Sequence, residues 1–230
     1  MGCSIPYGVV LTTVRYRRVM KQGRTSGNRL DRRTWTLAAL EAFAEGGPTS
    51  VAVEPLAKKL GVTKGSFYWH FPNRQALLAA ALDLYEQEGT ESVITSLRDQ
   101  AQAKDQLERL LTLVFKDEGG DPVYYALLAN ASDPSVAPVL GRITTRRLDY
   151  LTQAMAEIGY SPVEAHHRAV LGYTTWLGLI QAERASGGRL FPSKQARTRY
   201  LTFLRTTVFS GSRAGSQPAH DSQHYASAER

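Results

Sequence analysis

The residues most capable of chemistry are the nine from Thr63 to Phe71, which read Thr-Lys-Gly-Ser-Phe-Tyr-Trp-His-Phe. Hydroxyl, ammonium, phenol and imidazole groups gather in this short segment without an apolar reason to do so. Groups of these kinds bind the phosphates and base edges of DNA. The segment therefore indicates a DNA-binding surface. A polar face on an ordinary helix bundle and a protein-binding patch are the alternatives.

A helix, a tight turn and a second short helix must position these residues. We expect the first of the two helices over residues 54–60, with Pro55 in its first turn, where a missing N–H costs nothing. Thr49 or Ser50 can cap this segment. Gly61 then supplies a left-handed turn residue, and the Thr63 hydroxyl caps the second helix.

Phe67 and Phe71 are four residues apart, so they share one helix face and should anchor the short helix on its neighbours. That orientation turns the other side chains outward, and Gly65 allows close approach of the backbone to a groove. The residues that we expect at the DNA are Thr63, Lys64, Gly65, Ser66, Tyr68, Trp69 and His70.

Helical periodicity continues from about residue 31 to residue 209, and no alternating strand pattern appears, so the fold class is all-α. A first helix is expected over 31–45 and ends at Gly46-Gly47-Pro48. Asn73 caps a fourth helix that extends past Gly89 to about residue 97. The remaining helices are expected at 107–115, 123–131, 133–158, 162–185 and 193–209.

The positive charge of the chain is concentrated at its N-terminus. Residues 1–33 hold eight basic side chains and one acid, which leaves 20 basic and 20 acidic side chains for residues 34–230. This basic arm can follow DNA phosphates. A solvated leader without function is the alternative. We expect residues 1–29 and the polar tail 211–230 to be disordered.

Residues 33–82 resemble the DNA-binding domain of the TetR family of transcriptional regulators. The similarity runs through Ala38-Ala39, Phe43, Gly47, the segments 56–62 and 63–71, Asn73-Arg74 and Ala76-Leu77-Leu78. The resemblance implies an N-terminal three-helix helix-turn-helix domain, residues 30–85. It also implies a larger helical ligand-binding and dimerisation domain, residues 86–210.

The resemblance also implies a role for individual residues. Tyr68 and His70 correspond to a phosphate-contacting pair, and Lys64 to a base or phosphate contact. Trp69 lies where base or sugar contacts occur, and Arg74 would hold a phosphate from the start of the fourth helix. Together they imply that the partner is a double-stranded DNA operator, read by a homodimer.

One stretch departs from the family pattern. The family places Thr or Ser and then a polar or basic residue just before its second helix, whereas this chain has Ala52, Val53, Glu54 and Pro55. Phosphate contacts from these side chains are therefore not expected. A phosphate would repel Glu54, which can instead accept from a cytosine amine.

The C-terminal half is expected to bind a small-molecule effector and to dimerise through its last two helices. Gly172, Thr175 and Gly178 form a small-residue face that suits helix contact, with core packing within one chain as the alternative. Aromatic and aliphatic residues of the middle helices are either pocket or core: Phe115, Tyr124, Tyr125, Leu128, Met155, Tyr173 and Trp176.

We expect a ligand-responsive repressor, with an activator of the same fold as the alternative. An all-α enzyme is disfavoured because the sequence offers no nucleophile motif, phosphate loop or metal spacing, and no cofactor is implied. The adjacent His166 and His167 point in different directions. An architectural DNA binder that uses the basic arm is a third possibility. Cys3 is the only cysteine and no apolar run reaches about 20 residues, so a cytoplasmic protein without a membrane span is expected.

Overall fold

A computed structural model describes residues 31–100, 102–116 and 121–209, and within these ranges the chain is helical with no strand. The all-α expectation is confirmed. The structure divides into two compact units, up to Tyr150 and from Leu151 onward, and we describe each by itself. The predicted disordered arm, 1–29, and tail, 211–230, lie outside the described residues.

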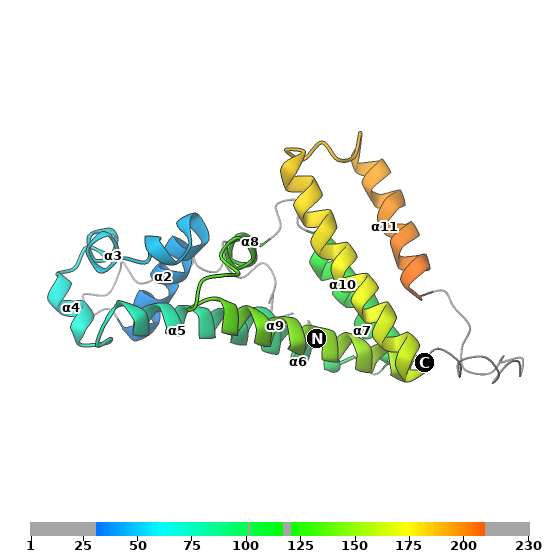
Figure 1. Ribbon diagram of the computed structural model, residues 1–230, viewed down its shortest axis with the longest axis horizontal. Helices are drawn as coiled ribbons and strands as arrows, with labels where there is room; N and C mark the ends of the chain where they lie inside the picture. The colour runs from blue at the N-terminus through cyan, green and yellow to red at the C-terminus, as the bar shows by residue number, and fades with distance from the viewer. Residues whose placement is uncertain (1–30, 101, 117–120, 210–230) are drawn as a thin grey trace, which may run out of the picture. The chain divides into compact units, whose positions relative to one another are not determined.

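The first unit begins with α2, Arg32–Gly46, followed by a 3₁₀ turn, Pro48–Ser50, and by α3, Val53–Leu60 (Figure 1). Asp31 caps α2 by accepting a hydrogen bond from the Thr34 N–H at 2.8 Å. The predicted end of this helix at Gly46-Gly47 is confirmed. Gly47 has φ 71°, and a Cβ there would lie 2.7 Å from Nδ2 of Asn130, so no other residue fits this position without strain.

The expected cap of α3 is wrong. Ala52 occupies the cap position and no side chain bonds the free N–H groups. Thr49 and Ser50 lie within the preceding 3₁₀ turn instead, where the Thr49 hydroxyl is 3.5 Å from the carbonyl oxygen of Gly46. The three-residue turn therefore holds both hydroxyls too far back along the chain to reach α3.

The predicted long fourth helix is confirmed, with one irregularity. Asn73 caps α5, Arg74–Glu86, and the helical path continues through a π-helical segment, Gln87–Glu91, into α6, Ser92–Arg98. At the π segment, a Cβ on Gly89 would lie 3.1 Å from the Tyr85 ring. Glycine thus lets this ring lie against the backbone where the helix widens.

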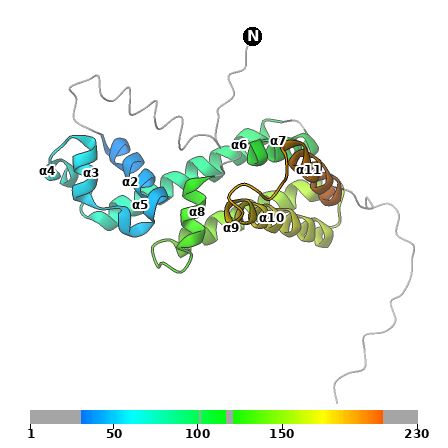
Figure 2. The ribbon, with the colours of Figure 1, turned by 90° about the horizontal axis from the view of Figure 1, so that it is seen from above.

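Three further helices complete the first unit: α7, Ala103–Lys116, α8, Pro122–Ala129, and the beginning of α9, Ala137–Glu157. Helix α9 begins later than predicted because Asp133 forms a turn and accepts from the Ser135 N–H at 2.8 Å. Helix α2 packs against both α5 and α8 (Figure 2). Helix α2 of the expected DNA-binding domain is therefore in contact with a helix of the expected effector domain.

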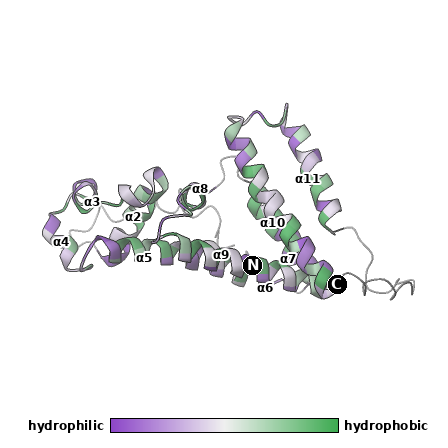
Figure 3. Ribbon diagram, viewed as in Figure 1, coloured by the Kyte–Doolittle hydropathy of each residue, from purple (hydrophilic) through white to green (hydrophobic). Residues whose placement is uncertain are grey.

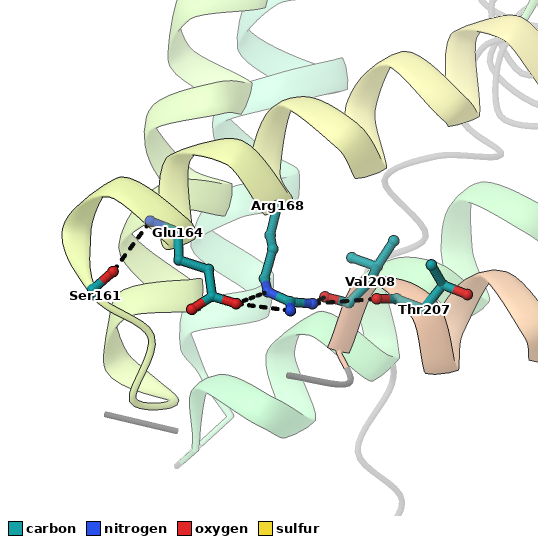
Figure 4. A network of polar contacts seen from close by, with 5 residues as sticks. All are labelled: Ser161, Glu164, Arg168, Thr207 and Val208. Atoms are coloured by element: carbon teal, nitrogen blue, oxygen red, sulfur yellow. Dashed lines mark hydrogen bonds and ion pairs between the residues drawn. The ribbon is translucent and has the colours of Figure 1, made fainter. Parts of the chain in front are cut away.

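The second unit is built on α10, Pro162–Ala185, and α11, Lys194–Phe209. The expected start of α10 is confirmed, since the Ser161 hydroxyl accepts from the Glu164 N–H. Arg168 pairs with Glu164 and donates to the carbonyl oxygens of Thr207 and Val208, at the end of α11 (Figure 4).

A second ion pair, between Arg197 and Glu183 at 2.7 Å, joins the end of α10 to the start of α11. Both side chains are about four-fifths buried, so this pair is less screened than a surface pair. Polar contacts thus fix the two helices together at both ends, and hydrophobic and hydrophilic residues alternate along both helices (Figure 3). Among the described helices, none is long and apolar enough to cross a membrane.

A buried polar cluster lies beside the π segment. The Tyr85 hydroxyl donates to Oδ2 of Asp121 at 2.6 Å, while Oδ1 accepts from the first N–H groups of α8. Arg147 donates to the carbonyl oxygen of Gly89 and to the Thr90 hydroxyl. Burial raises the pKa of Asp121, and these hydrogen bonds offset only part of that effect.

The raised pKa of Asp121 gives a stability prediction. A folded-state pKa above the unfolded one means that stability is lost as pH rises through that range. Asp121→Asn keeps a good helix cap without the charge. From pH 4 to pH 7, its free energy of unfolding should rise relative to that of the wild type by on the order of 1 kcal/mol. Urea unfolding at both pH values measures this difference. Identical pH dependence in the two proteins would show that the Asp121 charge costs nothing.

Candidate nucleic-acid interface

The short helix α4, Lys64–Tyr68, is held by two phenylalanine side chains. Phe67 and Phe71 are fully buried, as predicted. The Phe67 ring lies 5.4 Å from the Trp35 ring of α2 and 5.8 Å from the Phe71 ring, centroid to centroid. This aromatic cluster fixes the orientation of α4 and therefore the direction of its exposed residues.

The turn before α4 has the predicted glycine geometry. Gly61 adopts φ 71° and ψ 31°, the left-handed conformation that favours glycine. Its N–H bonds the Lys58 carbonyl oxygen, and the Val62 N–H bonds that of Ala57. These bonds close α3 and set the angle at which the chain enters α4.

The predicted hydroxyl cap from Thr63 is wrong. Thr63 stands at the cap position with extended backbone, but its side chain forms no cap hydrogen bond. The Ser66 N–H bonds the Thr63 carbonyl oxygen at 3.0 Å instead, so a tight backbone turn already satisfies the donor that the hydroxyl would have reached. The Thr63 side chain is consequently exposed and available to an outside partner.

The outward face of α4 is the one expected from the sequence. Tyr68 is 57% exposed and Trp69 is 76% exposed, which is unusual for such large rings. Lys64 and Gly65 are exposed, and Ser66 and His70 are partly exposed. A Cβ on Gly65 would meet nothing closer than the Thr63 hydroxyl at 3.7 Å, so packing within the protein does not require glycine there.

An ion pair joins the starts of α3 and α4. Nζ of Lys64 lies 2.6 Å from Oε1 of Glu54, and both side chains are more than half exposed. The hydrogen bond and the charge of Lys64 lower the pKa of Glu54, and Glu54 in turn raises the pKa of Lys64. Their pairing is not evident from the sequence, where the two residues stand ten positions apart.

Arg74 has an internal role that the sequence did not reveal. Its Nε donates to the carbonyl oxygen of Val51 at 2.6 Å, and its Nη2 donates to that of Pro48. These bonds tie the start of α5 to the loop before α3. They occupy two guanidinium nitrogens, so the phosphate contact proposed for Arg74 has to compete with bonds that hold the domain together.

Arg32 also stabilises the folded domain, although its place in the sequence suggests that it belongs to the basic arm. Its Nη1 donates to the His70 carbonyl oxygen at 2.6 Å, and its guanidinium lies 4.2 Å from the centre of the Phe71 ring. Arg33 pairs with Glu88 at 2.6 Å. Two of the eight basic residues at the N-terminus are therefore bound within the protein.

The seven predicted pocket residues are divided between the two units. Phe115, Tyr124, Tyr125 and Leu128 belong to the first unit, whereas Met155, Tyr173 and Trp176 belong to the second. Tyr124 is fully buried beneath the Arg147 guanidinium, and the rings of Tyr173 and Trp176 lie 5.8 Å apart. A role of these residues in ligand binding stays a prediction.

Metal binding has no support among the described residues, where no three His, Cys, Asp or Glu side chains come together. The rings of His166 and His167 lie 6.4 Å apart and are tilted by 52°.

Residues 36–81 match the family of bacterial regulatory proteins known as the tetR family. Over 47 residues the chain is 43% identical to the uncharacterised HTH-type transcriptional regulator YuxN of Bacillus subtilis, a match that covers 20% of this chain and 16% of that protein. The chain spans about a third or less of the length of the first curated relatives that it matches.

Solved structures extend the similarity in fold. The reduced form of E. coli NemR has a TM-score of 0.63 at 18% identity, covering 76% of this chain and 95% of that one. A putative transcriptional regulator from Saccharomonospora viridis, in complex with choline, has a TM-score of 0.61 at 19% identity, also over 76% and 95%. The curated relative YuxN carries the name of a transcriptional regulator, in keeping with the expectation that this chain is not an enzyme.

Substitutions in the aromatic cluster and on the exposed face of α4 should differ greatly in their effect on stability. Phe67→Ala should lower the free energy of unfolding by about 3–5 kcal/mol, because it removes a buried ring that positions α4. Trp69→Ala removes a larger but exposed ring and should change stability by less than about 0.5 kcal/mol. Urea unfolding compares the two variants, and a similar loss in both would contradict the assigned orientation of α4.

Proposed function

The chain belongs to the tetR family of bacterial regulatory proteins through residues 36–81, and on this premise we propose that it is a ligand-responsive transcriptional repressor that binds a palindromic DNA operator as a homodimer. The observation that carries the proposal is the geometry of α4. Buried Phe67 and Phe71 hold the helix while Tyr68 and Trp69 stay exposed beside Lys64. In a helix-turn-helix, the second helix enters the major groove.

The exposed groups of α4 suit the parts of a DNA duplex. The Tyr68 hydroxyl, the His70 ring and the Thr63 hydroxyl can bond phosphate oxygens, which positions the protein. Lys64 can contact phosphate or the acceptors of guanine, and Trp69 can contact a sugar or a thymine methyl group. Arg74 and Ser66 add contacts from the flanks, with Gly65 allowing the backbone close to the groove wall.

Dimerisation is supported by the surfaces of α10 and α11. Val163 is 66% exposed, Leu171 is 45% exposed and Phe203 is 62% exposed, so both helices carry apolar side chains that are not covered within the chain. Gly178 has open space around it, whereas Gly172 lies against Val208 of the same chain. The small-residue face is therefore divided between internal packing and a surface for a second copy.

Control by a small molecule is supported by the packing of α8. Through Asn130, the end of this helix lies close against Gly47, at the turn that leads into α3. A ligand that moves α8 would displace the turn and tilt the helix-turn-helix, which favours release of DNA. The choline complex of the Saccharomonospora viridis regulator supports a small molecule as the effector class. Such a regulator would act in the cytoplasm, beside the DNA that it binds.

The operator can be found by selecting bound sites from random DNA. At the selected site, Lys64→Ala and Tyr68→Phe should each weaken binding by about fivefold to a hundredfold, because each removes a polar contact worth about 1–3 kcal/mol. Fluorescence anisotropy at fixed salt measures the affinity, with circular dichroism to confirm folding. Selection of no site by the folded wild type would overturn the proposed function.

The dimer proposal predicts that a charge on the exposed apolar surface separates the two copies. Phe203→Asp should convert a dimer into a monomer, because it introduces an unpaired carboxylate into a surface that a partner would bury. Analytical ultracentrifugation measures the mass. Thr202→Asp, which adds the same charge at the neighbouring exposed position on another side of α11, is the matched control. A wild type that is monomeric at micromolar concentration would contradict the proposal.

A further inference from the structure

Glu54 lies at the DNA-facing surface with its carboxylate beside the first residue of α4. Its Oε1 is 2.6 Å from Nζ of Lys64, and the side chains of Glu54 and Lys64 are 73% and 52% exposed. Glu54 belongs to the first turn of α3, so the ion pair spans the two helices of the helix-turn-helix at its solvent side. An acid therefore neutralises the lysine that is best placed to meet DNA.

The fold has no evident need for this ion pair. Exposed pairs contribute little to stability, and α3 is held by the burial of Leu56 and Ala57. Helix α4 is held by Phe67, as described above. The main effect of the Glu54 carboxylate therefore falls on whatever approaches Lys64 from solvent.

A DNA duplex is the approaching partner under the proposed function. A phosphate near Lys64 also comes near Glu54, whose charge repels it and competes for the lysine. Enclosing the carboxylate against DNA without a donor adds a desolvation cost. The cost disappears only at a base pair that offers a donor, since a Glu carboxylate accepts from the exocyclic amine of cytosine in the major groove.

We infer that Glu54 is a specificity-determining residue, which lowers affinity for DNA of arbitrary sequence and favours an operator with a major-groove amine donor opposite it. This inference rests on the proposed function. It assigns a role to the position where the chain departs from the family pattern. Glu54 disfavours phosphate contact at the start of α3 and, for the same reason, makes DNA binding selective for base sequence.

The test compares Glu54→Gln with Glu45→Gln in the full chain. Both variants remove one negative charge from an exposed side chain. Glu45 lies 13 residues beyond Arg32, about 20 Å along α2. Its carboxylate is 4.0 Å from Nζ of Lys59, which pairs more closely with Glu41 at 2.7 Å. Glu45→Gln therefore controls for net charge without touching the recognition surface.

Affinity is measured for the selected operator, for single base-pair variants of it and for a scrambled duplex, each between 50 and 300 mM salt. Glu54→Gln should bind the scrambled duplex about tenfold more tightly, with a salt slope steeper by about 0.9 for each lysine released. Preference at one base pair in each half-site should fall by about tenfold. Glu45→Gln should match the wild type within about twofold on every duplex.

The inference is overturned if Glu54→Gln and Glu45→Gln bind all duplexes alike. It is also overturned if the scrambled duplex is bound more tightly while every base preference is unchanged, because the carboxylate would then read no base. Failure of the wild type to select any site is a separate result, which counts against the proposed function. Lys64→Ala combined with Glu54→Gln should abolish the change in salt slope, since no lysine remains to be released.

Discussion

Burial of Phe67 against Trp35, and of Phe71 against Phe67, is the constraint on which the proposed DNA-facing surface depends. A helix of five residues does not persist in water by itself, because the nucleation cost exceeds what one turn returns. Its direction is therefore set by side chains that it buries. Arg32 reinforces this arrangement by covering the Phe71 ring and bonding the His70 carbonyl oxygen. The exposed residues of α4 depend on these contacts for their positions.

The same domain is tied to the helices that follow it. Arg74 links the start of α5 to the loop before α3, and Gly47 leaves room for Asn130 of the segment that ends α8. Further along, the π segment brings Gly89 and Thr90 into contact with Arg147 of α9. Because these contacts join successive elements of the first unit, a displacement of α8 or α9 would be carried to the helix-turn-helix as a shift of whole elements.

Local chemistry predicted the fold well where the signal is local. Gly61 and the Asn73 and Ser161 caps mark helix ends because each acts on neighbouring backbone, and the spacing of Phe67 and Phe71 identifies the buried face. The contacts that the sequence did not predict depend on three-dimensional geometry. The Thr63 hydroxyl is not used as a cap because a backbone carbonyl already satisfies the Ser66 N–H, and Arg74 donates to the carbonyl oxygens of Val51 and Pro48 because the fold brings that loop beside it. Neither fact is visible in the sequence.

The distribution of charge separates attraction to DNA from the reading of its sequence. Residues 34–230 carry equal numbers of basic and acidic side chains, and Arg32 and Arg33 are bound within the protein, which leaves six basic residues earlier in the chain. Long-range attraction to phosphate, which is blind to sequence, would then come mainly from that arm. The folded domain, in which Glu54 pairs with Lys64, therefore does not need a strong sequence-independent attraction to DNA. Discrimination between base pairs improves when the reading surface has little affinity for the backbone alone, because wrong sites are then left with few favourable contacts.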